Sequence, residues 1–400
     1  MDKRIAEHLK LFKENTVDFL CEEEIISKLK KSFSSKNPLK LKIGFDPTAK
    51  DIHLGHTVLL RKLRKLQDSG HRVYLIIGDF TARIGDPSGR TALRPVLSDE
   101  EIKDNASTYT QQAFKILDRK KTEIIYNSIW YKNMKLTDFL SLLSSYTLAR
   151  ILERDDFSKR VKNNKPLTVL EIIYPLIQGY DSCRLEADVE FGGTDQKFNL
   201  IVGRHLQQAL GQEPQAVITM PLLIGLDGNN KMSKSLNNYV GITESPKEMF
   251  GKLMSIPDKV MWEYFRLLTD YSLDKAQKMH PKEAKESLAR EIVSFYYNAE
   301  AAESQKQEFR RVFSRKELPS KIKEYRVKSG KIDLVEVLYQ SGTVTSKNEA
   351  RRLLNQKAIS VSPSKEADYE PVESQELEIN AKGKVLKVGK KRFLKLIPPD

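Results

Sequence analysis

Two histidines, His53 and His56, lie three residues apart at the predicted start of a helix. Residues at this spacing share one helical face, so both imidazoles point toward the helix end, where unpaired amides and the dipole favour anions. Gly55 between them has no side chain, so a flat ring or a ribose could approach the backbone there. The pattern is typical of a nucleotide-phosphate site, although a histidine pair at a helix start is also common on polar surfaces.

A second candidate element is the run Lys-Met-Ser-Lys-Ser at residues 231–235. It follows a turn-rich loop at residues 225–230, which can swing two ammonium groups over a polyphosphate. Alone, such a run is more often a solvated stretch of charge. The two elements together, in this order, resemble the paired signatures of class I aminoacyl-tRNA synthetases, and the pairing is specific.

The elements that position the histidine pair are predicted as strand, turn and helix. Apolar residues alternate with lysine or glycine over residues 39–45, which predicts a strand covered on one face. An Asp-Pro-Thr turn follows, and apolar residues then recur at helical spacing until Gly70. Residues 73–77 are a continuous apolar run, as in a strand covered on both faces. This order predicts a doubly wound parallel sheet, in which Asp86 and Arg90 would face the same crevice as the histidines.

Three polar residues, Tyr174, Gln178 and Asp181, fall at spacings of four and three in a predicted helix and so share one face. Each would need a partner if buried, so the pattern favours a ligand-binding face over plain core packing. The stretch Phe-Gly-Gly-Thr-Asp-Gln at residues 191–196 adds two glycines for close backbone approach, and its Asp195 suits ribose hydroxyls. The alternative for that stretch is an ordinary strand-to-helix turn capped by the aspartate.

Composition bounds the class of protein. With 400 residues, the chain can hold two or three domains, and its net charge of +14 fits a nucleic-acid partner, although a basic surface can also meet anionic lipid. No apolar run reaches the roughly 18 residues of a membrane span, and the start is charged, so we expect a cytoplasmic protein without a membrane partner. Cys21 and Cys183 stand far apart, which argues against disulfides or a zinc site. Any metal should arrive with the substrate.

We expect four segments along the chain. Residues 1–38 should form a polar N-terminal helical arm, and residues 39–240 a Rossmann-like α/β catalytic domain with a helical insertion at residues 98–165. Residues 241–318 carry helical patterns. Residues 319–400 hold 17 Lys and Arg against 11 Asp and Glu, a net charge of +6, and their patterns predict two short helices and a basic hairpin. The fold class is therefore α/β, a doubly wound parallel sheet followed by an α-helical domain and a small α+β domain.

Five motifs sharpen the resemblance to the bacterial type of tyrosyl-tRNA synthetase, and it covers nearly the whole chain. They are, in the family's order, Gly-Phe-Asp-Pro-Thr at 44–48, Ile-Gly-Asp-Pro-Ser-Gly at 84–89, the Tyr, Gln and Asp helix, Gly-Gly-Thr-Asp-Gln at 192–196 and Lys-Met-Ser-Lys-Ser at 231–235. The resemblance implies that residues 98–165 make a dimer contact and that residues 241–318 meet the anticodon stem. It also implies that the last segment is a small RNA-binding domain, for which the alternative is a basic solvated cap.

The family's functional residues transfer to matching positions. By resemblance, Asp181 holds the substrate phenol, and the amino and carboxylate groups are met by Asp86, Tyr174, Gln178 and Gln196. ATP is met by Asp46, Gly55, Gly192, Gly193, Asp195 and Lys234, and the catalytic contacts to phosphate come from Thr48, His53, His56, Arg90, Arg94, Lys231 and Lys234. The basic charge of the last segment, and not the resemblance, leads us to expect tRNA contacts from Arg351, Arg352 and Lys357; Arg351 and Arg352 stand side by side at the start of a capped helix. ATP enters as a substrate with Mg²⁺, no metal is held by protein ligands, and no cofactor is tightly bound.

One position departs from the common family pattern. Many members carry a tyrosine two residues before Gly44, where it helps bind the substrate hydroxyl, and this chain has Lys42 there. Because another branch of the family is basic at this place, we interpret Lys42 as the mark of a subgroup. The second contact to the hydroxyl stays unassigned.

The implied chemistry has two steps. The tyrosine carboxylate attacks the α-phosphate of Mg-ATP and displaces pyrophosphate, and a ribose hydroxyl of the tRNA terminal adenosine then attacks the adenylate. Neither step needs a protein nucleophile, because catalysis rests on positioning and on stabilising phosphate charge. The alternatives are a tryptophanyl-tRNA synthetase or another nucleotidyl transferase, opposed by the polar helix face and the appended domain, and a non-enzymatic RNA-binding paralogue, opposed by the complete signatures.

Overall fold

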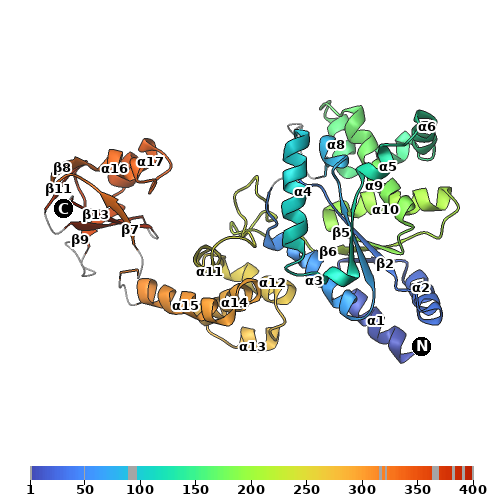
Figure 1. Ribbon diagram of the computed structural model, residues 1–400, viewed down its shortest axis with the longest axis horizontal. Coiled ribbons are helices and arrows are strands. Elements are labelled where there is room, and N and C mark those ends of the chain that lie inside the picture. Colours follow the sequence, from blue (N-terminus) through green and yellow to red (C-terminus); the bar gives the residue numbers. More distant parts are fainter. Residues whose placement is uncertain are drawn as a thin grey trace. The chain divides into compact units, whose positions relative to one another are not determined.

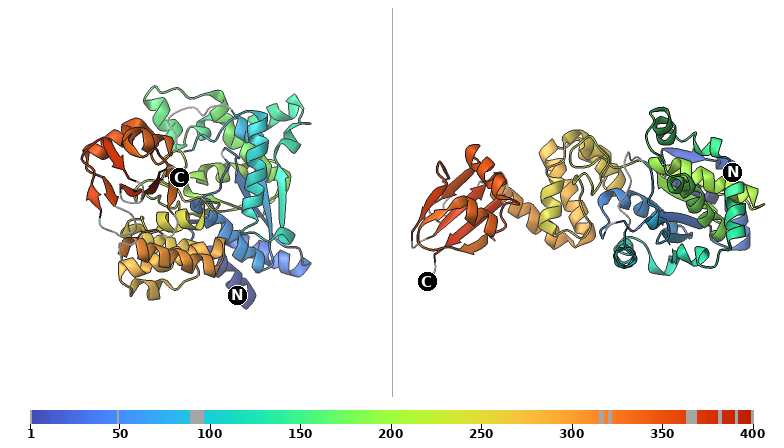
Figure 2. Two further views of the ribbon diagram at one scale, coloured as in Figure 1. Left: turned by 60° about the vertical axis from the view of Figure 1, so that its left-hand side comes forward. Right: turned by 90° about the horizontal axis from the view of Figure 1, so that it is seen from above.

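The computed structural model describes residues 2–48, 50–88, 97–314, 318–319, 322–362, 369–380, 383–389 and 392–398. Two predicted phosphate-binding residues, Arg90 and Arg94, lie outside these ranges. Contacts divide the chain into two compact units, Met1–Asn298 and Ala299–Asp400. Figures 1 and 2 colour them along the sequence.

The first unit is built on a six-stranded sheet in the order β1-β6-β5-β2-β3-β4. The strands are β1 (Asp18–Leu20), β2 (Lys40–Phe45), β3 (Arg72–Ile77), β4 (Thr122–Tyr126), β5 (Val189–Gly193) and β6 (Ala216–Met220). Strands β2 to β6 run parallel, and β1 pairs antiparallel with β6 at one edge. The strand order reverses between β2 and β5, which confirms the predicted doubly wound fold, and ligands bind at such a reversal.

Helices cover both faces of this sheet (Figure 1). On one face lie α1 (Lys3–Lys13) and α3 (Leu54–Asp68), and Phe12 of α1 stacks on Phe191 of β5 with ring centroids 6.3 Å apart. On the other face lie α9 (Val169–Leu185) and α10 (Lys197–Ala209). These two helices approach closely because Gly179 faces Gly203, and a Cβ on Gly179 would lie 3.0 Å from the Gly203 backbone. The contact fixes the helix that carries the predicted ligand-binding face.

Strand β2 corrects the prediction of a strand covered on one face. It lies between β5 and β3, with Leu41 and Ile43 buried on one face and Lys42 fully buried on the other. The alternation of apolar and polar residues was misleading because Lys42 is a buried charge with a partner of its own, Glu190.

Two strands fall inside segments that were predicted to be helical. β1 lies between α1 and α2 (Glu22–Ser35) in the expected N-terminal arm, and its three residues are too few to show an alternating pattern. β4 lies within residues 98–165, after α4 (Asp99–Ala113), and forms the other edge of the sheet. The remainder of that segment is helical, with α5 (Ser128–Tyr131), α6 (Leu136–Ser144), α7 (Leu148–Ile151) and α8 (Asp155–Lys162).

The helices of the predicted third segment up to residue 298 belong to the first unit, and its helix at Ala299–Phe309 belongs to the second. Those in the first unit are α11 (Pro246–Leu253), α12 (Asp258–Leu268), α13 (Leu273–Gln277) and α14 (Pro281–Tyr296). Because α12 packs on α3 of the sheet layer, no division appears near residue 240, and the units separate after Asn298. None of the helices in the described part of the chain is long and apolar enough to cross a membrane.

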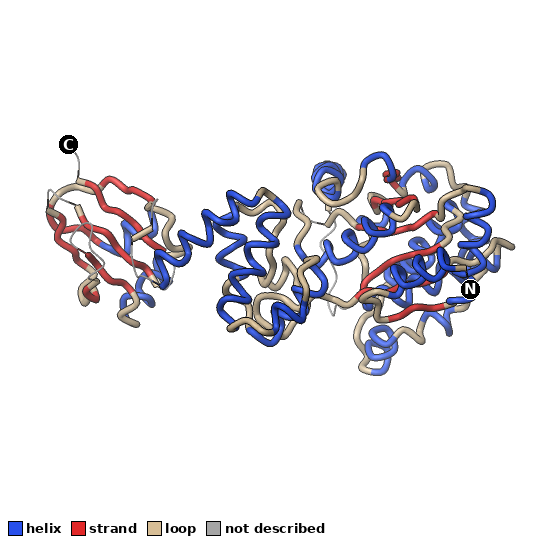
Figure 3. Tube along the Cα trace, turned by 90° about the horizontal axis from the view of Figure 1, so that it is seen from below, coloured by secondary structure: helices blue, strands red, loops and turns tan. Residues whose placement is uncertain are grey.

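The second unit contains a five-stranded and a two-stranded sheet, drawn in red in Figure 3. Its helices are α15 (Ala299–Phe309), a π-helical turn at Arg310–Ser314, α16 (Leu334–Gln340) and α17 (Lys347–Asn355), and its strands are β7 (Lys323–Arg326), β8 (Gly330–Asp333), β9 (Ile359–Ser362), β10 (Glu370–Pro371), β11 (Glu376–Ile379), β12 (Lys384–Val388) and β13 (Arg392–Ile397). Leu338 of α16 and Leu386 and Leu394 of the two hairpin strands are fully buried in one apolar core. The antiparallel pair β12 and β13 is the hairpin predicted from the sequence.

Candidate active site

A cavity of about 650 Å³ opens beside β2, β3 and β5 at the strand-order reversal. It gathers every described residue predicted to bind tyrosine or ATP or to act in catalysis: Asp46, Thr48, His53, Gly55, His56, Asp86, Tyr174, Gln178, Asp181, Gly192, Gly193, Asp195, Gln196, Lys231 and Lys234. The volume suits a small-molecule ligand buried on most sides. In the described ranges, no group of three or more His, Cys, Asp or Glu side chains could hold a metal ion.

The histidine pair forms the start of α3, as predicted. His53 Nδ1 accepts a hydrogen bond from the Gly55 N–H at 3.2 Å, and His56 Nδ1 accepts one from the His53 N–H at 3.3 Å. With both Nδ1 atoms accepting, each neutral ring carries its proton on Nε2. Burial lowers the pKa of His56 to about 4 and that of His53 well below its usual value, and nearby Lys234 acts in the same direction. Near pH 7 the pair therefore offers two neutral N–H donors rather than positive charge.

The two lysines of residues 231–235 supply the positive charge. Lys231 Nζ lies 2.6 Å from the Asp195 carboxylate. Lys234 Nζ is buried without a hydrogen-bond partner among the described residues, 5.6 Å from the centre of the Tyr109 ring. Burial lowers the pKa of Lys234 to about 8. A buried ammonium group without an acceptor is costly, so this site favours an anionic ligand.

Another part of the cavity lining consists of hydrogen-bond acceptors and amides. Tyr174 donates through its hydroxyl to Asp46 at 2.8 Å. Gln196 donates through Nε2 to Asp86 at 2.7 Å, and the second oxygen of Asp86 accepts from the Ser88 N–H at 2.9 Å. These contacts order the side chains before any substrate binds.

Asp181 lines the cavity and is almost fully buried. It accepts hydrogen bonds from Asn127 Nδ2 at 3.2 Å, Trp130 Nε1 at 2.9 Å and the Tyr131 hydroxyl at 3.2 Å. Burial raises the pKa of Asp181 to about 6, while the charge of Lys42 and the three donors oppose that rise. At pH 7 the group is mainly a carboxylate, which can accept a phenol hydrogen.

These three donors were missed from the sequence. They lie just beyond the carboxyl end of β4, in a segment interpreted as helical insertion. Recognising β4 would have indicated them, because residues following parallel strands line the ligand crevice.

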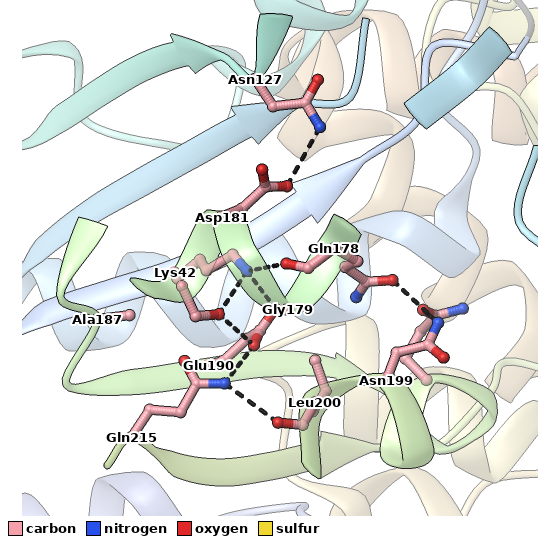
Figure 4. Close-up of polar contacts among 12 residues, drawn as sticks. Lys42, Asn127, Gln178, Gly179, Asp181, Ala187, Glu190, Asn199, Leu200 and Gln215 are labelled. Atoms are coloured by element: carbon pink, nitrogen blue, oxygen red, sulfur yellow. Dashed lines mark hydrogen bonds and ion pairs between the residues drawn. The ribbon is translucent and has the colours of Figure 1, made fainter. Parts of the chain in front are cut away.

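Lys42 has no donor left for the substrate (Figure 4). Its ammonium group lies 2.9 Å from Glu190 and donates to Ser182 Oγ at 2.6 Å and to the Gln178 carbonyl oxygen at 3.1 Å. Glu190 in turn accepts from Ser182 at 2.9 Å and Gln215 at 2.5 Å. An ammonium group has three N–H bonds, and all three have partners here. Lys42 therefore belongs to a buried ion pair with Glu190 and has no N–H group available for a substrate hydroxyl.

The residues predicted to bind tRNA all lie in the second unit. Arg351 and Arg352 are exposed on α17, and Lys357 is exposed just after it, 3.1 Å from Glu373. Their exposure leaves them accessible to phosphates, and their role stays a prediction.

Family comparisons agree with this architecture. The family model "tRNA synthetases class I (W and Y)" matches residues 34–314, and the "Tyrosine–tRNA ligase SYY-like C-terminal domain" matches residues 308–396. The chain is 48% identical to a tyrosine–tRNA ligase of Carboxydothermus hydrogenoformans, over 98% of each chain, and 49% identical to that of Aquifex aeolicus, again over 98% of each.

A solved structure supports the fold. The tyrosyl-tRNA synthetase from Archaeoglobus fulgidus, complexed with L-tyrosine, superposes with a TM-score of 0.61 at 24% identity, covering 76% of this chain and 99% of that one. With both family models and full-length relatives in agreement, the chain belongs to the tyrosine–tRNA ligases, a family of class I aminoacyl-tRNA synthetases.

Proposed function

We propose that this enzyme activates L-tyrosine with Mg-ATP, forming tyrosyl-adenylate and pyrophosphate, and then transfers tyrosine to the terminal adenosine of tRNA(Tyr) in the cytoplasm. One observation carries the proposal: a single cavity is lined both by a buried carboxylate, Asp181, and by the histidine pair and Lys234. The carboxylate suits a phenol hydroxyl, and the histidine pair with Lys234 suits a polyphosphate.

In the first step, the tyrosine carboxylate attacks the α-phosphate in line while pyrophosphate leaves. Negative charge spreads over the phosphate oxygens, and donors fixed beforehand stabilise it without reorganising. His53 and His56 contribute neutral Nε2–H groups, and Lys231 and Lys234 contribute positive charge. Mg²⁺ comes with ATP as part of the substrate.

In the second step, a ribose hydroxyl of the tRNA attacks the adenylate carbonyl and AMP leaves. No protein nucleophile takes part in this scheme. Neither Cys21 nor Cys183 is among the residues that line the cavity, and burial raises the pKa of Cys183 to about 12.

Asparagine and glutamine substitutions separate the two nitrogens of each histidine. Asparagine places an oxygen near the Nδ1 position and keeps the helix-start contact, whereas glutamine places an N–H near Nε2. We expect His56→Asn to raise the activation free energy of adenylate formation by about 1–3 kcal/mol, the range for a lost hydrogen bond to a charged group. His56→Gln should raise it by less. The same order is expected at His53. Single-turnover pyrophosphate release measures the rate, and the Kd for tyrosine should stay nearly constant. Weaker tyrosine binding at an unchanged rate would make these histidines ground-state ligands.

We propose that the enzyme is a homodimer that meets through the region of α6 to α9. Large apolar side chains are exposed there: Leu136, Leu140, Leu148, Val161, Val169 and Leu170. An apolar patch of this kind commonly marks a protein interface. Leu136→Glu with Leu140→Glu should convert the dimer to a monomer in sedimentation equilibrium, whereas Leu236→Glu, an exposed leucine elsewhere, should not. A wild-type monomer at micromolar concentration would contradict the proposal.

We propose that the second unit holds tRNA and takes no part in activating tyrosine. A chain ending at Pro319 keeps α15 but lacks both sheets of the unit and the helices α16 and α17, so it should keep ATP–pyrophosphate exchange and lose most tRNA charging. Arg351→Glu with Arg352→Glu should give a milder form of this split. Each lost phosphate contact should lower the slope of log affinity against log salt by roughly 0.7 to 0.9. Full charging by the truncated chain, or equal loss of both activities in a truncated chain that is still folded, would contradict the proposal and show that residues 320–400 are a basic cap.

The tryptophan alternative is not favoured. The class I family model covers both kinds of enzyme, but the C-terminal domain model and the full-length relatives belong to tyrosine ligases.

A further inference from the structure

A closed ring of hydrogen bonds joins three residues that line the cavity to two residues that do not. It starts at Arg154, which precedes α8 and is 6% exposed. The guanidinium donates to Ser88 Oγ at 2.9 Å, to Asn199 Oδ1 at 3.2 Å and to both oxygens of Asp156 at 2.7 and 2.9 Å. Arg154 thus connects the helical segment after β4 with the loop of Asp86 and with α10.

Asn199 is the second member of the ring and is 1% exposed. Its Nδ2 donates to Gln178 Oε1 at 2.9 Å and to Gln196 Oε1 at 3.1 Å (Figure 4 shows the first). Gln196 Nε2 then donates to Asp86, whose other oxygen accepts from the backbone of Ser88. The ring closes because Ser88 also accepts from Arg154.

The direction of every bond in this ring is set by its two ends. A guanidinium group can only donate, so Asn199 must turn its oxygen toward Arg154 and its NH₂ toward the two glutamines. Both glutamine oxygens therefore face Asn199. At the other end, an ionised Asp86 can only accept, which places the Gln196 NH₂ against it. No alternative amide orientation satisfies all of these groups.

The orientation decides what the substrate meets. Gln196 uses one N–H on Asp86 and keeps the second, which suits a carboxylate. Gln178 Oε1 and Asp86 each keep lone pairs, which suit an ammonium group. Asn199 and Arg154 are not among the residues that line the cavity, so they act through the glutamines and Asp86.

We propose that Arg154 and Asn199 are positioning residues that fix the amide orientation of Gln178 and Gln196, and thereby the recognition of the ammonium and carboxylate groups of the amino-acid substrate. The inference rests on the proposed function, because it takes tyrosine as that substrate.

Four ligands of the full-length chain separate this role from simple structural support. They are L-tyrosine, tyramine, which lacks the carboxylate, 3-(4-hydroxyphenyl)propionate, which lacks the amine, and 4-ethylphenol, which lacks both. Asn199→Leu removes the amide with little change of shape. We expect this variant to raise the Kd for L-tyrosine by about 10- to 100-fold, as for lost hydrogen bonds to charged groups. The Kd for 4-ethylphenol should rise by less than about twofold.

Asn199→Asp tests the direction of the bonds. An aspartate still accepts from Arg154 but cannot donate, so both glutamines must turn their NH₂ groups toward it. Gln196 then turns its oxygen toward the Asp86 carboxylate, and its second N–H no longer lies where the substrate carboxylate would meet it. We expect the Kd values for L-tyrosine and for 3-(4-hydroxyphenyl)propionate to rise by at least about tenfold, and the Kd for tyramine to rise by a smaller factor than either.

Arg154→Met should resemble Asn199→Leu, and Arg154→Lys, which keeps a donor, should restore part of the affinity for L-tyrosine. The matched control is Arg160→Met. Arg160 is also 6% exposed, lies in α8 and pairs with Glu171 at 2.6 Å outside the ring. The Arg160→Met variant should lower the Tm and leave the Kd values of the four ligands in the same proportion to one another as in the wild type.

Equal weakening of all four ligands in folded Asn199 variants, or an unchanged affinity for L-tyrosine, would overturn the inference. A wild-type chain that fails to bind L-tyrosine would instead overturn the proposed function, so the two failures are distinguishable.

Discussion

Asp181→Ala should abolish most of the preference for tyrosine over phenylalanine in adenylate formation. A pocket built to pair a buried hydroxyl rejects an analogue without one, because the buried carboxylate would lose its partner. Tyrosyl-tRNA synthetase is itself the standard example of such rejection, at about 100,000-fold, and the figure is taken from that example. The measurement is kcat/KM in ATP–pyrophosphate exchange with each amino acid. The ratio should fall by several orders of magnitude, mainly through slower reaction of tyrosine.

The ratio is the appropriate quantity because the substitution also leaves the Trp130 indole N–H without its acceptor. Asn127 and Tyr131 each lose one acceptor, but they still donate to the Thr81 hydroxyl and to the Ile177 carbonyl oxygen, respectively. These lost hydrogen bonds lower the stability of the variant, and they should lower kcat/KM by the same factor for tyrosine and phenylalanine, so their effect cancels in the ratio. Trp130→Phe is the matched control: it removes one donor to Asp181 and keeps the carboxylate, so most of the ratio should survive. An unchanged ratio in Asp181→Ala would place the hydroxyl contact elsewhere in the cavity, and not at Lys42, because all three Lys42 donors are occupied.

The second large effect concerns stability. Lys42→Met leaves Glu190 as a buried carboxylate without its counter-ion, since both side chains are 1% exposed. Removing one partner of a buried pair costs about 3–5 kcal/mol, whereas replacing both by neutral groups is often close to neutral. We therefore expect Lys42→Met to lower the free energy of unfolding by that amount, and Lys42→Met with Glu190→Gln to recover most of it.

Urea unfolding at pH 7 measures both variants. The exposed pair Lys31–Glu213, with side chains 66% and 47% exposed, is the control, and Lys31→Met should cost less than about 1 kcal/mol. A small loss in Lys42→Met would show that Glu190 finds enough support from Ser182 and Gln215. In that case, the ion pair is not what holds β2 against α9.

The sequence predicted the doubly wound sheet well because its strongest signals are local. The histidines sit where the turn before α3 places them, and the polar face of α9 follows from helical spacing alone. The cavity then collects these residues because parallel strands end at one edge.

What the sequence did not predict depends on contacts between distant segments. Lys42 looked like a solvent-facing lysine, and only the fold brings Glu190 beside it. Asn127 and Trp130 belong to no recognisable motif. They donate to Asp181 because they follow β4, whose end lies near that carboxylate. Arg154 and Asn199 stand 45 residues apart, so their hydrogen bond could not be read from spacing.

Amino-acid-dependent ATP–pyrophosphate exchange, run with each of the twenty amino acids, tests the central claim most directly. Exchange requires the carboxylate of the amino acid to be held in line with the α-phosphate of ATP. It therefore requires that the residues proposed to bind the amino acid and those proposed to bind the phosphates act on both substrates at once. The structure and the family predict a signal with tyrosine alone. A signal with tryptophan, or no signal with any amino acid, would contradict the assignment of this cavity to tyrosine activation.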